Sequence, residues 1–462
     1  MNKLAAAVLS IVCFATACGT LEVGLEATAT TRHEQTTVQL TPTITPLTTP
    51  TRSNEPSPGQ QGNDHSGSPS ISADGQYVAF SSSANNLVAS DTNACADVFV
   101  YDRTAGSLEI VSLAADGSLA NETSSQPSIS ADGRWVSFVS LASNLVDQDD
   151  NDMQDVFLLD RQTGLIALVS RNVNGQAGNG VSGEPMLSAD GRWVVFSSAA
   201  EDLVPDVDEH TGANIADTNE MTDIFVYDRL GDYVRRVSIS STGEQADRPS
   251  DLPGISTDGR LVVFWSLADN LVEGMGQGIY LHDRSDGTTR WIADGFAPTI
   301  SPDGRWVGYL AVADDPLTDS TFYQAMLYDL HTEQTVPVGA YAREIHGRPS
   351  SAIIFSTDGA WSAFTSTFAT PDNPSVDISG EWGQQIFVRE NDTGSLTLAS
   401  ATPDGLPGNS YSAIPSLSAD GRWIAFQSFA DNLVAGDSNG WMDIFVWDRQ
   451  TGEIELISIA TE

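Results

Sequence analysis

Lysine is almost missing from this chain, and basic residues are scarce in general. The 462 residues include 21 Lys and Arg, of which Lys3 is the only lysine, against 62 Asp and Glu, so the formal net charge at pH 7 is −41. Such a surface repels nucleic-acid phosphates and anionic lipid headgroups. The composition therefore argues against nucleic-acid binding, and it favours cationic partners or metal ions.

Cysteine and long apolar runs are also scarce. The three cysteines are Cys13, Cys18 and Cys95. If the chain is cut before Cys18, Cys95 alone remains in the folded part, which leaves no pair for a disulfide framework and no cysteine set for zinc. The one sustained apolar run, Leu4 to Phe14, is too short to span a bilayer as a helix.

The first segment, residues 1–18, has the features of an export signal. Lys3 gives it a positive start, the short apolar run follows, and Ala15-Thr-Ala-Cys18 places small residues before a cysteine. These four residues resemble the lipobox of bacterial lipoproteins, a family in which lipid is attached to the cysteine before cleavage. The resemblance implies lipidation at Cys18, and we expect a protein of the cell envelope, outside the cytoplasm and lipid-anchored to a membrane. The alternative is an ordinary secretory signal cut after Ala17.

Residues 19–65 are rich in Thr, Pro, Ser and Gln, as in Leu40-Thr-Pro-Thr-Ile-Thr-Pro46. This composition predicts a disordered linker that reaches roughly 40 Å as a flexible coil, more if it is polyproline-like. Thr36 to Leu40 alternates in polarity and could add one edge strand to the following domain.

From residue 66 the sequence repeats itself. An apolar strand, a Ser-x-Asp-Gly turn and an alternating second strand recur seven times, 45 to 68 residues apart, with the turns at Asp74, Asp132, Asp190, Asp258, Asp303, Asp358 and Asp420. A nearly wholly apolar third strand and a short fourth strand follow each turn. Repeats of this length that are built only of strands predict a β-propeller over residues 66–462, all-β, with seven blades of four antiparallel strands.

The repeated Pro-Ser-Ile-Ser-Ala-Asp-Gly-Arg-Trp-Val and Asp-Ile-Phe-Val-x-Asp-Arg-x-Thr-Gly segments resemble the TolB-type, or WD-repeat-like, propeller family over residues 66–462. The resemblance implies an extracytoplasmic propeller that binds proteins or peptides through a ring face or the channel mouth. Related repeats also form the gating domain of prolyl-oligopeptidase-type hydrolases.

The pattern Asp-x-Asn-x-x-x-Asp precedes the third strand in four units. Oxygen side chains in a loop can hold a hard cation, and calcium takes about six to eight oxygen ligands. The other interpretation is that Asp and Asn bond their own backbone and set a turn. The candidate calcium ligands are Asp91, Asn93, Asp97, Asp149, Asn151, Asp155, Asp217, Asn219, Asp223, Asp437, Asn439 and Asp443.

The tryptophans fall into two groups. One group follows the Asp-Gly turns and is expected to pack blade against blade: Trp135, Trp193, Trp306 and Trp423. The other group lies outside that register, in units four to six, and is predicted to be available for partner binding: Trp265, Trp291 and Trp382. Irregularity confined to these units is equally consistent with sequence drift.

The sequence therefore predicts a monomeric, membrane-anchored propeller that binds an envelope protein, peptide or glycan and is not an enzyme. The alternative function is a hydrolase or lyase with its site at the channel mouth. A catalytic site would bring perturbed carboxylates or histidines to the axis, whereas a binding site would present aromatic and apolar side chains.

Overall fold

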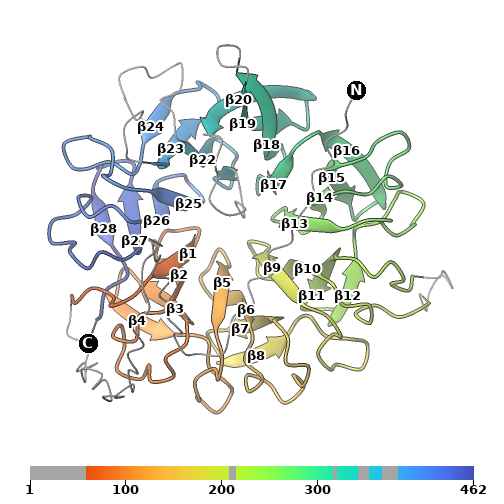
Figure 1. Ribbon diagram of the computed structural model, residues 1–462, viewed down its shortest axis with the longest axis horizontal. Coiled ribbons are helices and arrows are strands. Elements are labelled where there is room, and N and C mark those ends of the chain that lie inside the picture. The colour runs from red at the N-terminus through yellow and green to blue at the C-terminus, as the bar shows by residue number, and fades with distance from the viewer. Residues whose placement is uncertain (1–58, 208–214, 316–319, 342–352, 367–382, 462) are drawn as a thin grey trace, which may run out of the picture.

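The computed structural model describes residues 59–207, 215–315, 320–341, 353–366 and 383–461. These residues form 28 strands in seven sheets, each of four sequence-consecutive antiparallel strands. The sheets stand around a central axis as the blades of a ring (Figure 1). The predicted seven-bladed β-propeller is confirmed. We number the blades 1 to 7 in chain order, from β1–β4 to β25–β28.

Each strand occupies the same radial position in its blade. The first strands, nearest the axis, are β1 (Ser66–Ile71), β5 (Ser124–Ile129), β9 (Ser182–Leu187), β13 (Ser250–Ile255), β17 (Phe296–Ile300), β21 (Ile353–Phe355) and β25 (Ser412–Leu417). The second strands are β2 (Tyr77–Ser82), β6 (Trp135–Ser140), β10 (Trp193–Ser198), β14 (Leu261–Ser266), β18 (Trp306–Asp315), β22 (Trp361–Ser366) and β26 (Trp423–Ser428). The third strands are β3 (Asp97–Asp102), β7 (Asp155–Asp160), β11 (Asp223–Asp228), β15 (Gly278–Asp283), β19 (Ser320–Asp329), β23 (Gln385–Glu390) and β27 (Asp443–Asp448). The outer, fourth strands are β4 (Ser107–Ile110), β8 (Leu165–Leu168), β12 (Tyr233–Arg236), β16 (Thr288–Ala293), β20 (Gln334–Tyr341), β24 (Leu396–Leu398) and β28 (Ile454–Leu456).

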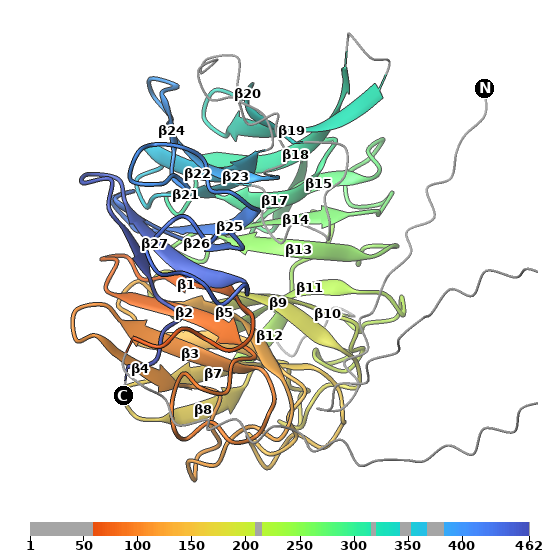
Figure 2. The same cartoon turned by 60° about the vertical axis from the view of Figure 1, so that its left-hand side comes forward.

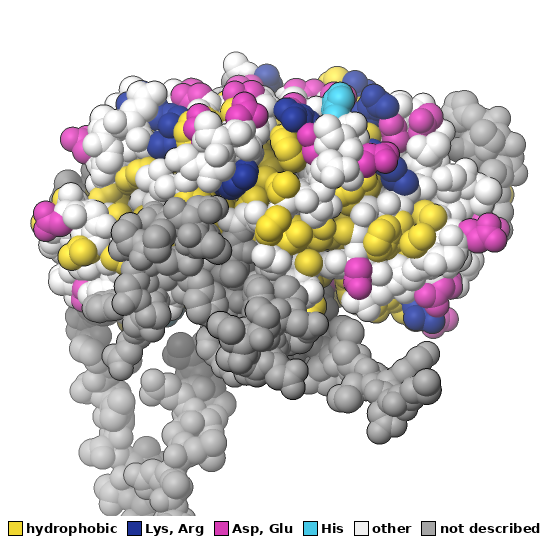
Figure 3. Space-filling model, turned by 90° about the horizontal axis from the view of Figure 1, so that it is seen from above, with side chains coloured by type: hydrophobic (Ala, Val, Ile, Leu, Met, Phe, Trp, Pro, Cys, Tyr) yellow, Lys and Arg dark blue, Asp and Glu magenta, His cyan; other side chains and the backbone are white. Residues whose placement is uncertain are grey.

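The ring has two faces with different connections. The turns from first to second strand and from third to fourth strand lie on one face, which we name the turn face. The connections from second to third strand and from each blade to the next lie on the opposite face, named the loop face. In blade 5 the ten-residue strands β18 and β19 extend beyond their neighbours (Figure 2). Arg side chains are interspersed with Asp and Glu along one face of the disc (Figure 3).

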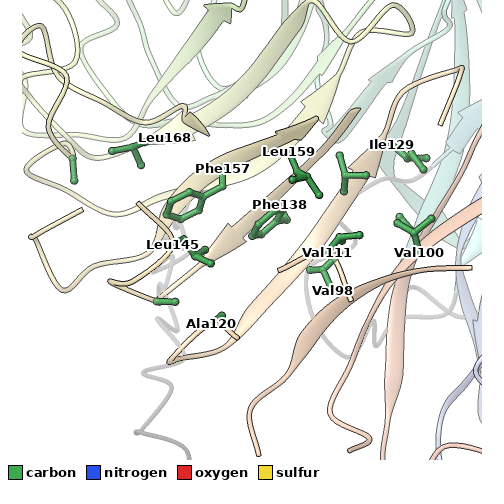
Figure 4. Packing of buried hydrophobic residues seen from close by; sticks show 14 residues of the cluster. Val98, Val100, Val111, Ala120, Ile129, Phe138, Leu145, Phe157, Leu159 and Leu168 are labelled. Carbon is green, nitrogen blue, oxygen red and sulfur yellow. The ribbon is translucent and has the colours of Figure 1, made fainter. Parts of the chain in front are cut away.

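The core lies between the blades rather than within one sheet. Phe138 and Phe157 stack with ring centroids 5.8 Å apart, and Val98 and Val100 of blade 1 belong to the same buried cluster (Figure 4). Every residue of β7 is buried, as expected for a strand covered on both sides. Burying such a side chain contributes about 2 kcal/mol, so the seams between blades supply much of the stability.

The Asp-Gly turns position an aromatic residue for the same seams. In blade 2, Asp132 Oδ1 accepts hydrogen bonds from Ser130 Oγ and from the Arg134 backbone N–H, and Gly133 has a φ of 69°. The Trp135 ring then lies against Gly191 of the next blade, where a Cβ atom would come within 2.4 Å. The other tryptophans predicted to pack between blades also contact the turn glycine of the following blade. They are Trp193, Trp306 and Trp423. The packing prediction for these four tryptophans is confirmed.

The ring is closed by residues 59–63, which the sequence analysis placed in the linker because of their composition. Gln61 bridges Ile459, and the Gly59 N–H donates to the Ala460 carbonyl over 2.7 Å. The segment 59–63, Gly-Gln-Gln-Gly-Asn, matches Gly-Gln-Ala-Gly-Asn at 175–179, which forms one side of an inter-blade hairpin. The last hairpin is therefore built from both ends of the propeller, and residues 59–65 belong with blade 1 rather than with the linker.

Among the described strands, all four of each blade come from one stretch of chain. Thr36 to Leu40 lies outside the described residues. Within the residues that the structure describes, no helix has the length and apolar character to cross a membrane.

Candidate functional site: the channel and its mouth

The first strands enclose a cavity of about 450 Å³ on the ring axis. Its lining comes from six of the seven blades and consists of Ser68, Pro69, Ser70, Gln126, Pro127, Ser128, Glu184, Pro185, Met186, Leu252, Pro253, Ile354, Ile414, Pro415 and Ser416. This volume falls within the range of small-molecule sites.

An unusual backbone conformation surrounds this channel. The residue before the channel proline has a φ between 49° and 56° in six blades, namely at Ser68, Gln126, Glu184, Leu252, Ala297 and Ile414. The pairing register shifts there in each of these first strands. Positive φ is costly for non-glycine residues and clusters at functional sites. The repeated bulge therefore identifies the channel wall as the specialised surface of the ring.

The channel wall has a polar side and an apolar side. Blades 1 to 3 contribute Ser68, Gln126 and Glu184, whereas blades 4 and 7 contribute Leu252 and Ile414. Among the described residues of the lining, Glu184 is the one ionisable side chain, and its Oε2 accepts a 2.9 Å hydrogen bond from the Leu252 N–H. The wall can thus contact an apolar group and a hydrogen-bonding group of one ligand at the same time.

Side-chain hydrogen bonds fix neighbouring first strands to one another. The Ile129 N–H donates to Ser70 Oγ over 3.1 Å, and the Ile71 N–H donates to Ser416 Oγ over 3.0 Å. The Ser68 N–H donates to Gln427 Oε1 over 2.9 Å. These bonds join blades 7, 1 and 2, so this part of the wall is pre-organised.

A second cavity, of about 280 Å³, lies beside the channel at the loop face. It shares Ser68 and Ile414 with the channel lining, and His65 and Gln427 form part of its wall. We name this recess the mouth pocket. The two cavities therefore adjoin each other at Ser68 and Ile414.

Three rings stand together next to the mouth pocket and form what we name the aromatic cluster: His65, Phe429 and Trp441. The His65 ring meets Trp441 edge-on at 4.7 Å and Phe429 at 5.4 Å between centroids. His65 Nδ1 accepts a hydrogen bond from the Met442 N–H, which leaves Nε2 as the ring donor. Phe429 is 41% exposed. His65 and Trp441 are half-buried. An exposed ring beside a polar pocket is typical of binding surfaces.

The Asp-x-Asn-x-x-x-Asp loops also lie on the loop face, and the one in blade 7 contains Trp441 and Met442. In blade 1, Asn93 Nδ2 donates to Asp97 Oδ2 and to the Ala120 carbonyl, while its Oδ1 accepts the Cys95 N–H. Asn151, Asn219 and Asn439 make corresponding contacts. The asparagines therefore set the turn, as the second interpretation predicted.

Calcium in all four loops is not supported. Across the described part of the chain, no three His, Cys, Asp or Glu side chains lie together as ligands of one ion. Burial, rather than a ligand, dominates the electrostatics. It raises the pKa of Asp91 and Asp155 to about 7 and that of Asp149, Asp223 and Asp443 to about 6.

The predicted partner-binding tryptophans have different environments. Trp265 is only 8% exposed, which corrects the expectation that its ring is available to a partner. Trp291 is half-buried against the core of blades 3 and 4, and Trp382 lies outside the described residues. The exposed ring cluster instead joins blades 7 and 1, among the regular repeats.

Sequence reasoning missed the aromatic cluster because its members are far apart in the chain. One signal was present at Trp441, which stands two residues after the loop asparagine, where the other regular units have Cys95, Met153 and Met221. A bulky aromatic in a repeat position otherwise held by smaller side chains indicates a local specialisation.

Fold and site together define a seven-bladed β-propeller with a recessed channel mouth. No family model matches the sequence, and no curated protein matches it. Two solved structures resemble it in fold: the oligogalacturonate lyase from Vibrio parahaemolyticus (15% identity, TM-score 0.51, 86% of this chain and 92% of that chain) and the β-propeller domain of the Trilobed protease from Pyrococcus furiosus (12% identity, TM-score 0.50, 87% and 97%).

TolB from Acinetobacter baumannii is also among the similar structures, at 14% identity over 72% of this chain. The match spans 62% of the TolB chain and has a TM-score of 0.39, too low to support a shared function. At these identities the similarities establish the β-propeller fold alone.

Proposed function

We propose that this chain is a lipid-anchored, extracytoplasmic β-propeller that binds a protein, peptide or glycan partner at its channel mouth. The observation that carries the proposal is the adjoining pair of cavities, which share Ser68 and Ile414 and have the aromatic cluster beside them. Exposed rings supply contact area at low entropic cost, and the pre-organised wall limits the ordering needed on binding.

The described part of the lining supports a non-catalytic role. Among its residues Glu184 is the single ionisable group, and it already accepts a backbone hydrogen bond. The carboxyl groups with raised pKa values belong to the loops and are not among the residues that line either cavity. General acid–base catalysis uses groups whose pKa is tuned at the site of reaction.

The experiment compares envelope material retained by the immobilised protein and by a Phe429→Ala/Trp441→Ala variant. Loss of one retained component by about tenfold or more, equivalent to about 1.4 kcal/mol, supports the channel mouth as the site. The matched control is Leu230→Ala, which removes a side chain that is 66% exposed on the turn face. Equal loss with the control variant would contradict the proposal.

A hydrolase or lyase at the channel mouth is the second candidate, and Glu184 is the observation that favours it. Turnover of a peptide or oligosaccharide retained by the protein, abolished by Glu184→Gln with binding unchanged, would establish this alternative. Turnover that persists in Glu184→Gln would remove Glu184 from any catalytic role.

A further inference from the structure

The four Asp-x-Asn loops differ in the hydrogen bonds that the carboxylate of their first aspartate accepts from other side chains. In blade 3, Gln245 Nε2 donates to Asp217 Oδ1 over 2.5 Å and to Asp223 Oδ2 over 2.9 Å. One nitrogen thus bridges the first and last carboxylates of the loop. In blade 7, Gln61 Nε2 donates to Asp437 Oδ1 over 3.0 Å.

Blades 1 and 2 have no such glutamine. Leu119 and Ala177 take its position, because each forms the same inter-blade hairpin bridge as Gln245. Asp91 is 4% exposed and Asp149 is 6% exposed, and among the described residues neither carboxylate accepts a hydrogen bond of normal geometry. The backbone N–H groups of Asn93 and Asn151 lie close enough to favour the charged carboxylates, but they offset only part of the cost of burial.

Among the described residues, no cation compensates these two loops. In blade 3, Arg236 Nη1 lies 3.4 Å from Asp217 Oδ2. The positions that pair in the same register are Ile110 in blade 1 and Leu168 in blade 2. In each of these two loops the buried first aspartate lies close enough to the buried last one for their charges to interact.

We propose that a hard divalent cation binds in the loops of blades 1 and 2, between Asp91 and Asp97 and between Asp149 and Asp155, at the place that Gln245 Nε2 fills in blade 3. Two carboxylates neutralise one such ion, and backbone carbonyls and water complete an oxygen shell. With two carboxylates per ion, the affinity falls in the range of extracellular modules, about 10⁻⁴–10⁻³ M. The loops of blades 3 and 7 bind no ion, because glutamine replaces it.

The variant Leu119→Gln/Ala177→Gln gives blades 1 and 2 the glutamine of blade 3. Equilibrium dialysis against calcium, and separately magnesium, at about 5 mM and constant ionic strength should find one ion in each of the two loops of the unaltered protein. It should find none in the variant. The same ions should raise the Tm of the unaltered protein by several degrees relative to chelator, and that of the variant by no more than ionic screening does.

The matched control is Asp437→Asn in blade 7, which removes a carboxylate from the same motif and should leave ion binding unchanged. If the glutamine variant does not fold, Asp149→Asn serves instead and should lose one of the two ions. Absence of bound calcium and magnesium in the unaltered protein, with equal Tm responses in all variants, would overturn the proposal and assign the two carboxylates to ordered water.

Discussion

The indole of Trp135 lies flat against the backbone of Gly191, the turn glycine of the following blade. A Cβ atom on Gly191 would come within 2.4 Å of the Trp135 ring, whereas one on Gly164, at a similar φ of 71°, would meet nothing within 4 Å. The Arg229 guanidinium covers the same indole at 3.8 Å. The Asp-Gly turns are therefore part of the seams between blades, and glycine is required there for space as well as for φ.

This contact predicts different costs for two similar substitutions. Gly164→Ala should lower the free energy of unfolding by about 1–2 kcal/mol, the cost of a left-handed alanine. Gly191→Ala should add a further cost of about 1–3 kcal/mol from overpacking against the indole. Urea unfolding of both variants measures the difference, and equal costs would show that the indole moves aside freely.

The ion pair between Arg134 and Asp160 makes part of the free energy of unfolding depend on pH. Two guanidinium hydrogen bonds of 2.7 Å from Arg134 lower the pKa of Asp160 to about 2 from 3.8. Because the folded-state pKa is the lower one, this stabilisation is complete above about pH 4 and is lost as the pH falls towards 2. Arg134→Gln should be less stable than the unaltered protein at pH 7, and the gap should close between pH 4 and pH 2. Thermal unfolding across this range measures it, and a constant gap would contradict the assignment.

The hairpin that closes the ring predicts where the N-terminus can be shortened. A chain beginning at residue 59 keeps the contacts of Gln61 and Gly62 with Asp437, Ser438 and Ser458, whereas one beginning at residue 65 loses them. The shorter chain should be less stable by roughly 3 kcal/mol, at about 0.5–1 kcal/mol for each hydrogen bond. Denaturant midpoints test this, and equal midpoints would show that the ring closes without the segment.

The anchor is tested by Cys18→Ala in a host that processes lipoproteins. The variant should move from the membrane to the soluble fraction, since firm retention requires more than one acyl chain. A variant that stays in the membrane pellet would contradict lipid anchoring through Cys18.

Much of the fold could be predicted because each blade repeats the same short sequence pattern. The turn at Asp132 and Gly133 is a tetrapeptide signal with a fixed physical requirement, and the apolar run of β7 shows its burial directly. The closing hairpin could not be predicted, because the bond between Gln61 and Asp437 joins positions 376 residues apart. Similarity between residues 59–63 and 175–179 becomes meaningful only when the ring is known to close.

The site was harder to predict than the fold for the same reason. Trp265 stands outside the common register, which made it look available, yet it is buried. Nothing in the sequence links His65 with Trp441, and only the ring geometry brings the two together from opposite ends of the propeller. Which face of a symmetric repeat carries function depends on contacts between blades, and these have no period in the sequence.

Photo-crosslinking in cells tests the central claim most directly, namely that the channel mouth on the loop face binds the partner. A photoreactive residue is placed at Phe429 in one variant and at Leu230, on the turn face, in another; both side chains are exposed, by 41% and 66%. The account predicts a discrete crosslinked envelope component from position 429 and none from position 230. The same component crosslinking from position 230 and not from 429 would contradict it.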